Sequence, residues 1–518
     1  MTCIRSIIRF LVLASLLPMD LGITQQTRLQ EGKPNRPNIL LLFADDQRCD
    51  TIHALGNPLI KTPSIDRLVN QGFHFTNAYC FGSPHGAVCI PSRAMLHAGK
   101  SLFRLSDVNL NLQGDRTLGQ ILGEHGYETF ATGKWHNGRD SFAASFSLGR
   151  NIMFGGMSNH AEVPVQQMDP HDKSFSESVT GSHFSSKLFA DAAIEFLNER
   201  TRRSDGNAGG PSETPFFCYV AFTAPHDPRM SPGNFNRLYR PHEMRVPPNF
   251  LPQHPFDNGD LMVRDEALME WPRRPELVQA QLADYYGLIS HLDAQVGRIL
   301  DALQASGEAE RTIIIYMADH GLALGSHGLL GKQNLYDHSM KAPLIIAGPG
   351  VQHGSSDALI YLHDLFATLL EFASISVPAD VDSRSLVPIL RGDSTDARAQ
   401  LFTCYGESMR AVRDQRWKLI RYPRINRTQL FDLEKDPDEM FDLGASEHEL
   451  HRTKVAHLYS LLERLQQESG DTHPLSVAEP QSGEIDLTGR ERKPDPWQPA
   501  WIVEKYFGRD SVDNLQKK

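Results

Sequence analysis

The 518-residue sequence has few cysteines, no long apolar run and no excess of positive charge. Its six cysteines are scattered and form no C-x-x-C pair, which argues against a zinc knuckle and a dense disulfide framework. No apolar run reaches the about 18 residues of a membrane-spanning helix, so no stable membrane span is expected. The formal charge of −11 argues against a general nucleic-acid binder, which needs a basic face.

A short apolar segment near the start of the chain has the layout of an export signal. Arg5 and Arg9 precede the apolar residues 10–17, and a proline and an aspartate follow. We therefore predict a signal peptide over residues 1–24 and an exported protein, periplasmic or secreted. A buried N-terminal helix is the alternative interpretation. Cleavage would remove Cys3 and leave five cysteines.

Strand and helix patterns alternate over residues 37–395. Continuous apolar runs such as "NILLLF", "PFFCYVAF" and "TIIIYMA" are typical of strands covered on both faces, and amphipathic stretches lie between such runs. This order predicts an α/β fold with a large, mostly parallel sheet sandwiched by helices. Asp45, Asp46, Asp319 and His320 directly follow two of these runs, at the strand ends where ligands bind in such sheets.

The pattern changes after about residue 395. "LFTCYGESMRAVRDQRWKLIRYP" predicts antiparallel strands, and "HELHRTKVAHLYSLLERLQQ" predicts an amphipathic helix. We therefore expect a smaller C-terminal α+β subdomain over residues 396–470. The polar tail, residues 471–518, is expected to wrap the surface or to be partly disordered.

The stretch "AVCIPSRAMLHAGK" places Cys89 just ahead of a proline and a helix start. On its own it could be half of a disulfide, a buried thiol or a nucleophile. A helix N-terminus offers free N–H groups and the positive end of the helix dipole, which suit an anionic ester. Arg93 lies one helical turn further on, so its guanidinium can reach back toward position 89.

The pattern C-x-P-S-R-x-x-L-x-x-G in this stretch resembles the signature of type I sulfatases, in the alkaline-phosphatase superfamily. The resemblance covers about residues 37–470, includes "LFDLEKDPDE", and is closest to bacterial choline-sulfatase-like and iduronate-sulfatase-like members. One departure is Ala98, where the family usually has threonine. The resemblance implies an alkaline-phosphatase-like catalytic domain over residues 37–395. It also implies that a formylglycine-generating or anaerobic maturase enzyme oxidises Cys89 to formylglycine (3-oxoalanine).

The resemblance also implies a metal centre. Asp45 and Asp46 match the family's first pair of ligands, Asp319 and His320 match the second, and position 89 completes the set. Three carboxylates at one site repel each other unless a cation neutralises them. Hard oxygen ligands favour Ca²⁺ over Mg²⁺, while His320 is a softer ligand than the asparagine of many relatives.

Four more residues match family positions and receive roles by resemblance. Lys134 and His136 lie in "TGKWHNG", His226 in "TAPHDPR" and Lys332 in "LLGKQN". Asp319 would deprotonate the hydrated formylglycine, which attacks sulfur while Lys134 and Lys332 hold the sulfuryl oxygens. His226, with Lys332, would protonate the departing alcohol. His136 would take the proton from the second hydroxyl, which expels sulfate and restores the aldehyde.

Four loop residues are candidates for substrate binding: Asp227, Arg229, His85 and His160. Local loop structure is an equal alternative for each. Because an exported enzyme meets sulfated polysaccharides, we expect a sulfuric ester hydrolase that releases sulfate from a sulfated carbohydrate. The alternatives are a choline-sulfate or aryl-sulfate hydrolase and a phosphonate or phosphate monoester hydrolase on the same scaffold. If Cys89 is never modified, a glycan-binding protein without turnover would result.

Overall fold

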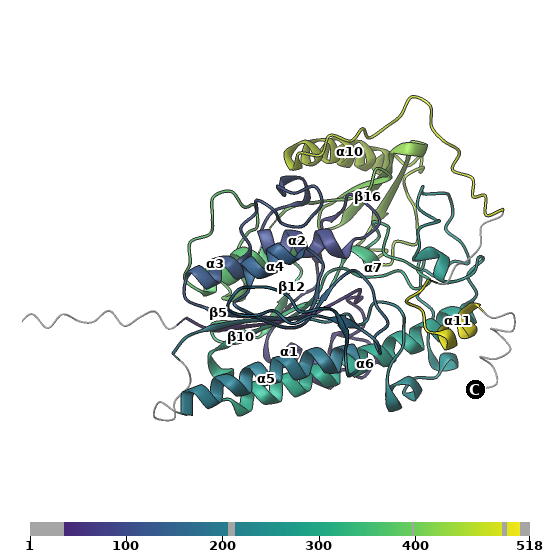
Figure 1. Ribbon diagram of the computed structural model, residues 1–518. Coiled ribbons are helices and arrows are strands. Elements are labelled where there is room, and N and C mark those ends of the chain that lie inside the picture. Colours follow the sequence, from purple (N-terminus) through teal and green to yellow (C-terminus); the bar gives the residue numbers. More distant parts are fainter. Residues whose placement is uncertain (1–35, 206–212, 396–397, 489–494, 508–518) are drawn as a thin grey trace, which may run out of the picture. The chain divides into compact units, whose positions relative to one another are not determined.

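The computed structural model describes residues 36–205, 213–395, 398–488 and 495–507 (Figure 1). The predicted signal peptide, residues 1–24, lies outside the described residues. A search of the described residues finds no helix with both the length and the apolar character needed to cross a bilayer.

A mostly parallel sheet of eight strands forms the centre of the fold, as predicted. Its strands in spatial order are β12 (Gly354–Ser356), β2 (Phe73–Phe75), β11 (Leu344–Ala347), β10 (Thr312–Ala318), β1 (Asn38–Ala44), β9 (Phe216–Ala221), β5 (Glu128–Trp135) and β6 (Leu148–Phe154). Strand β1 runs parallel to β10 and β9, and β5 runs parallel to β9 and β6. Strand β11 is antiparallel to both of its neighbours.

Helices cover both faces of this sheet, which explains the continuous apolar strands (Figure 1). One face carries α1 (Pro63–Gln71), α5 (Ser185–Asp205) and α6 (Pro275–Ala305). The other carries α2 (Cys89–Ala98), α3 (Leu118–Glu124) and α4 (Arg139–Ser145), with α8 (Leu365–Phe372) packed on α2 and α3. Short elements before residue 400 include β3 (Ala78–Tyr79), β13 (Ile360–Tyr361), β7 (Pro164–Val165), β8 (Val179–Thr180), α7 (Asp337–Met340) and α9 (Val387–Leu390).

A second, smaller sheet follows, with α10 (Glu449–Ser469) packed on it. Its order is β17 (Arg427–Asp432), β16 (Trp417–Tyr422), β15 (Met409–Arg413), β14 (Leu401–Tyr405) and β4 (Gly82–Ser83). The predicted antiparallel strands and terminal helix are confirmed. Strand β4 comes from the first part of the chain and pairs in parallel with β14. The predicted boundaries 37–395 and 396–470 stay predictions.

The described part of the C-terminal tail contains one helix, α11 (Ala500–Phe507), which the sequence pattern did not predict. Residues 498 and 505 of this part make side-chain contacts with residues that precede or lie on α6. This part of the tail is therefore held against the large domain.

Candidate active site

The register between β1 and β10 brings the two predicted strand-end pairs together. Ala44 pairs with Ala318, so the next residue on each strand, Asp45 and Asp319, leaves the sheet beside the other. The backbone N–H of Asp46 donates to Asp319 Oδ1 at 3.0 Å. The acidic residues seen at the ends of two separate apolar runs therefore form one cluster.

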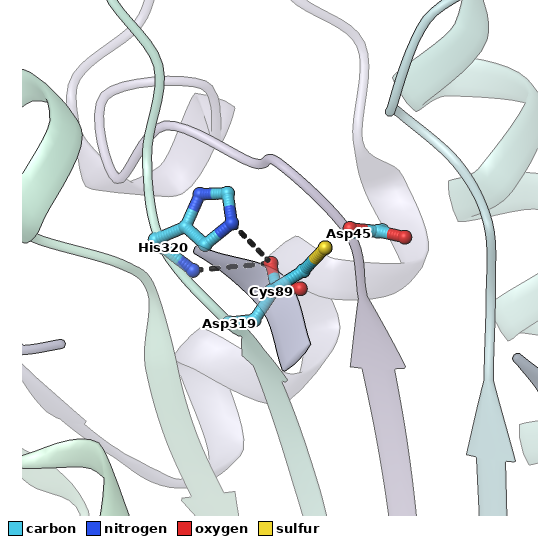
Figure 2. Close-up of side chains that lie close together, drawn as sticks. All are labelled: Asp45, Cys89, Asp319 and His320. Atoms are coloured by element: carbon cyan, nitrogen blue, oxygen red, sulfur yellow. Dashed lines mark hydrogen bonds and ion pairs between the residues drawn. The ribbon is translucent and has the colours of Figure 1, made fainter. Parts of the chain in front are cut away.

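Cys89 is the first residue of α2, and its side chain reaches the same cluster (Figure 2). One ligand atom each from Asp45, Cys89, Asp319 and His320 lies within 4.8 Å of the others. Asp45 Oδ1 and His320 Nε2 are buried and have no hydrogen-bond partner among the described residues. A cation would satisfy both atoms, so the residues present fit a metal ion.

Asp46 belongs to this region but is held differently. Its two carboxylate oxygens each accept a hydrogen bond of 2.8 Å from Lys332 Nζ. His320 Nε2 lies 3.4 Å from Asp46 Oδ1, and His226 Nε2 lies 3.7 Å from Asp46 Oδ2. The structure thus brings all five predicted ligands together, and the Asp46 carboxylate also lies beside the predicted catalytic residues Lys332 and His226.

Two predicted catalytic side chains from the end of β5 contact the Cys89 sulfur. Lys134 Nζ lies 3.5 Å from Cys89 Sγ and donates to Asp45 Oδ2 at 2.5 Å. His136 Nδ1 lies 3.6 Å from the same sulfur. These two residues, from one strand end, flank the position where the nucleophile is expected.

Arg93 is buried on α2, and its guanidinium points at the metal cluster. Its Nη2 lies 3.5 Å from Asp45 Oδ2 and 3.4 Å from Asp319 Oδ2. Its Nη1 donates to the backbone carbonyl of Lys134 at 3.1 Å. The contacts of Arg93 therefore brace the carboxylates that would bind the metal.

The cations create a positive potential at position 89. Burial raises the pKa of the Cys89 thiol, but Lys134, His136 and Lys332 outweigh it and hold this pKa well below its usual value. By contrast, burial raises the pKa of Asp319 to about 6. The site therefore stabilises negative charge at residue 89, and a tetrahedral anionic ester is the class of ligand that it suits.

Two of the candidates for substrate binding, Asp227 and Arg229, are buried. Asp227 is buried and ion-paired with Arg264, and the buried Arg229 donates to Gln281 Oε1 at 2.6 Å. These contacts are those expected under the alternative of local loop structure, and contact of either residue with substrate stays a prediction.

His160 is fully buried, and His85 is exposed. One ring nitrogen of His160 contacts the hydroxyls of Ser185 and Thr223, and the other contacts the backbone carbonyl of His226 at 2.9 Å. This histidine supports the loop beneath the site and has no nitrogen left for a substrate. His85 lies on the loop that leads into α2 and stays a prediction.

Two contacts of the site were not predicted. Ser92 Oγ donates to the backbone carbonyl of Asp319 at 2.8 Å and so ties α2 to the end of β10. Asp265 Oδ2 lies 3.9 Å from Lys332 Nζ. Ser92 belongs to the quoted motif, but Asp265 lies in a polar stretch without periodicity, so no sequence signal marks it.

Comparisons with known proteins agree with this geometry. A sequence model of the sulfatase family matches residues 37–375. A second, described as N-sulphoglucosamine sulphohydrolase, C-terminal, matches residues 325–468. The chain therefore belongs to the sulfatase family and is a sulfuric ester hydrolase with the alkaline-phosphatase-like fold.

The relatives include an N-acetylglucosamine-6-O-sulfatase of Bacteroides thetaiotaomicron, 28% identical over 89% of this chain and 91% of its own. A choline-sulfatase of Rhizobium meliloti is 29% identical over 79% of this chain and 82% of its own. Among solved structures, a protein in complex with its substrate D-glucosamine-2-N,6-O-disulfate has a TM-score of 0.69 at 22% identity, over 85% of this chain and 99% of its own. The phosphonate monoester hydrolase of Agrobacterium radiobacter has a TM-score of 0.63 at 22% identity, over 84% of this chain and 96% of its own.

Proposed function

We propose that this enzyme releases inorganic sulfate from a sulfated carbohydrate, with a formylglycine derived from Cys89 and a bound divalent cation. One observation carries the proposal: Cys89 lies at a helix start within 4.8 Å of three predicted metal ligands and beside two predicted catalytic side chains, Lys134 and His136. The carbohydrate is inferred from relatives that include an N-acetylglucosamine-6-O-sulfatase and an ulvan-active sulfatase.

The donor set supports Ca²⁺ as the cation, with Mg²⁺ second. Asp45, Asp46 and Asp319 supply hard carboxylate oxygens, and His320 supplies one nitrogen. These residues would hold a divalent cation, which would stabilise charge on the sulfuryl oxygens, and the hydrated aldehyde of a formylglycine at position 89 would supply the nucleophile. The residues around position 89 then perform the remaining work of binding and proton transfer.

Lys134 and Lys332 stand on two sides of the site and bind the sulfuryl oxygens, where charge develops. Asp319 accepts the proton from the attacking hydroxyl, since it follows β10 in the same cluster as the residue 89 side chain. His226, beside Asp46, donates a proton to the departing alcohol. His136, 3.6 Å from the residue 89 side chain, accepts the proton that is lost when sulfate leaves.

Mass spectrometry of the peptide that contains Cys89 tests the modification. Conversion of Cys89 to formylglycine removes H₂S and adds one oxygen atom, so the mass of the peptide falls by the difference between the masses of H₂S and oxygen. Cys89→Ala should fold, bind the sulfated ligand and hydrolyse nothing, whereas Cys80→Ala, a buried cysteine outside the ligand cluster, should stay active. An unmodified Cys89 in active enzyme, or full activity in Cys89→Ala, would contradict the mechanism.

The structural likeness to a phosphonate monoester hydrolase keeps phosphonate or phosphate ester hydrolysis as the second candidate. A comparison of kcat/KM for a sulfate ester and a phosphonate ester of the same phenol distinguishes the two functions. A ratio in favour of the phosphonate would overturn the proposed function. A panel of sulfated mono- and disaccharides, with choline sulfate included, would then identify the substrate.

Export and maturation belong to the same proposal. A protein with the predicted signal peptide over residues 1–24 would work in the periplasm or outside the cell, where sulfated polysaccharides occur. A formylglycine-generating or anaerobic maturase enzyme would modify Cys89. Fractionation of cells that express the full chain tests the location, and retention of the protein in the cytoplasm would contradict it.

A further inference from the structure

The described tail residues 495–507, here called the C-terminal segment, lie beyond the last residue matched by either family model, 468. The C-terminal segment joins a group of charged side chains next to the active site. At the centre of this group is Arg264, whose guanidinium contacts three carboxylates: those of Asp227, Asp265 and Asp495.

Asp227 is the member of this group that touches the catalytic machinery. Its carboxylate receives two hydrogen bonds from Arg264, at 2.7 and 2.5 Å, and one from Gln498 Nε2 at 2.8 Å. The side chain is about 5% exposed, so water does not compete for these contacts. The Asp227 carboxylate is therefore held by two residues, with Arg264 on both oxygens and Gln498 on Oδ2.

On its other side, Asp227 contacts the predicted general acid. His226 Nδ1 lies 2.8 Å from the backbone carbonyl of Asp227 and 3.3 Å from its Oδ1. With Nδ1 engaged in this way, the ring turns Nε2 toward Asp46, at 3.7 Å, and so toward the reacting ester. A proton donor aligned by a third group is a recurring feature of acid–base catalysis.

We propose that Asp227 is a positioning residue for His226, and that Arg264 and Gln498 of the C-terminal segment hold Asp227 in place. The inference rests on the proposed function, because it assigns a support to that reaction's proton donor. It also gives the C-terminal segment a role in the efficiency of catalysis.

The proposal predicts a kinetic effect that a purely structural ion pair would not produce. Protonation matters most for a poor leaving group, because a good leaving group departs as its anion. Loss of alignment at His226 should therefore slow the hydrolysis of phenyl sulfate much more than that of 4-nitrophenyl sulfate. A general loss of folding or of active protein would lower both rates by the same factor.

The test uses full-length, matured enzyme and these two esters. For Asp227→Asn we expect kcat/KM to fall about 10- to 100-fold on phenyl sulfate and less than about threefold on 4-nitrophenyl sulfate. For Gln498→Leu, the ratio of kcat/KM on phenyl sulfate to kcat/KM on 4-nitrophenyl sulfate should fall in the same way, by a smaller factor. The matched control is Lys505→Met, which removes a 2.7 Å ion pair between α11 and Asp284 without touching Asp227, and it should leave the ratio unchanged.

A crystal structure of Asp227→Asn provides a readout that needs no substrate. A His226 ring that keeps its place, with Nε2 as close to Asp46 as in the wild type, would overturn the inference, as would equal losses on both esters. If wild-type enzyme with modified Cys89 cleaves neither sulfate ester nor any sulfated sugar, the proposed function fails instead. The position of the His226 ring then still decides the positioning role.

Discussion

Two buried lysines of the active site each have a carboxylate partner. Lys134 and Asp45 are both fully buried, and Lys332 faces Asp46 with little exposure. Removal of one partner leaves an uncompensated buried charge, which costs about 3–5 kcal/mol. Lys134 and Lys332, which are proposed to bind the sulfuryl oxygens, therefore also stabilise the fold around the site.

Lys134→Met tests both contributions at once. We expect the free energy of unfolding to fall by about 3 kcal/mol because Asp45 loses its closest cation, and kcat to fall about 10²–10³-fold because one donor to the sulfuryl oxygens is gone. Chemical denaturation and steady-state kinetics measure the two effects. Lys187→Met removes an exposed pair with Asp191 on α5 and should change neither by much. A kcat within about threefold of the wild type would exclude Lys134 from the reaction.

Asp293 gives the protein a pH-dependent stability outside the active site. The backbone N–H groups of Ser64 and Ile65 donate to its carboxylate at the start of α1, and burial raises its pKa from 3.8 to about 6. Since the folded protein holds this proton more tightly than the unfolded chain does, stability is lost as the pH rises from about 4 through about 6.

Asp293→Asn keeps a hydrogen-bond acceptor at this position but cannot ionise. Its free energy of unfolding relative to wild type should therefore rise by about 2 kcal/mol between pH 4 and pH 7. Urea denaturation across this range measures the difference. Asp301→Asn, at an exposed site on the same helix, should leave the wild-type profile unchanged. If the difference in free energy of unfolding between Asp293→Asn and wild type did not change with pH, the raised pKa of Asp293 would be contradicted.

At the scale of elements, an irregularity in β5 directs Lys134 into the site. The register between β5 and β6 shifts between Thr132 and Gly133, and Gly133 has φ +94°. A Cβ atom at Gly133 would lie 1.9 Å from the carbonyl oxygen of Ala221 on β9. Glycine is therefore required here, both for its conformation and for the close approach of two strands.

Gly133→Ala should destabilise the fold by more than the about 1 kcal/mol that an unfavourable φ alone costs, and should lower activity by displacing Lys134. Gly126→Ala is the matched control, because Gly126 has φ +88° but a Cβ atom added there would meet no atom within 4 Å. The comparison of urea midpoints separates close approach from backbone strain. Equal urea midpoints for Gly133→Ala and Gly126→Ala would contradict the requirement for close approach of two strands at Gly133.

At the scale of the whole molecule, the metal cluster joins three elements that are far apart in the sequence. Asp45 follows β1, Asp319 follows β10, and Cys89 begins α2. A bound cation stabilises only the folded arrangement of these residues, because the unfolded chain does not bring them together. Metal binding should therefore contribute to both stability and activity.

Chelation should inactivate the enzyme and lower its thermal midpoint, and Ca²⁺ should restore both more fully than Mg²⁺. A cation present at about 100 times its Kd contributes about 2.7 kcal/mol to the free energy of unfolding. Calorimetry with and without each ion measures the shift. Asp319→Asn should show little response to Ca²⁺, and a wild-type protein with the same midpoint before and after chelation would contradict the site.

The alternation of apolar and amphipathic segments was enough to predict the mostly parallel sheet, its helical layers and the C-terminal antiparallel strands. Local composition carries this information because buried strands and amphipathic helices bury apolar area with different periods. The acidic residues after two strands marked the predicted site by their place at strand ends, and the motif at Cys89 marked it by resemblance to a family signature. Both signals lie in short stretches of consecutive residues.

Other features depend on residues that are distant in sequence. The sequence did not predict that β4 would pair with β14 or that α11 would pack near the active site. It left open whether Asp227, Arg229 and His160 contact substrate or local loop partners. Whether a charged loop residue faces substrate or an internal partner depends on which segments pack against it. The residues around position 89 could therefore be marked from short motifs and their resemblance to a family, whereas the contact between Asp227 and the C-terminal segment exists only in the folded chain, because Gln498 lies 271 residues from Asp227 in the sequence.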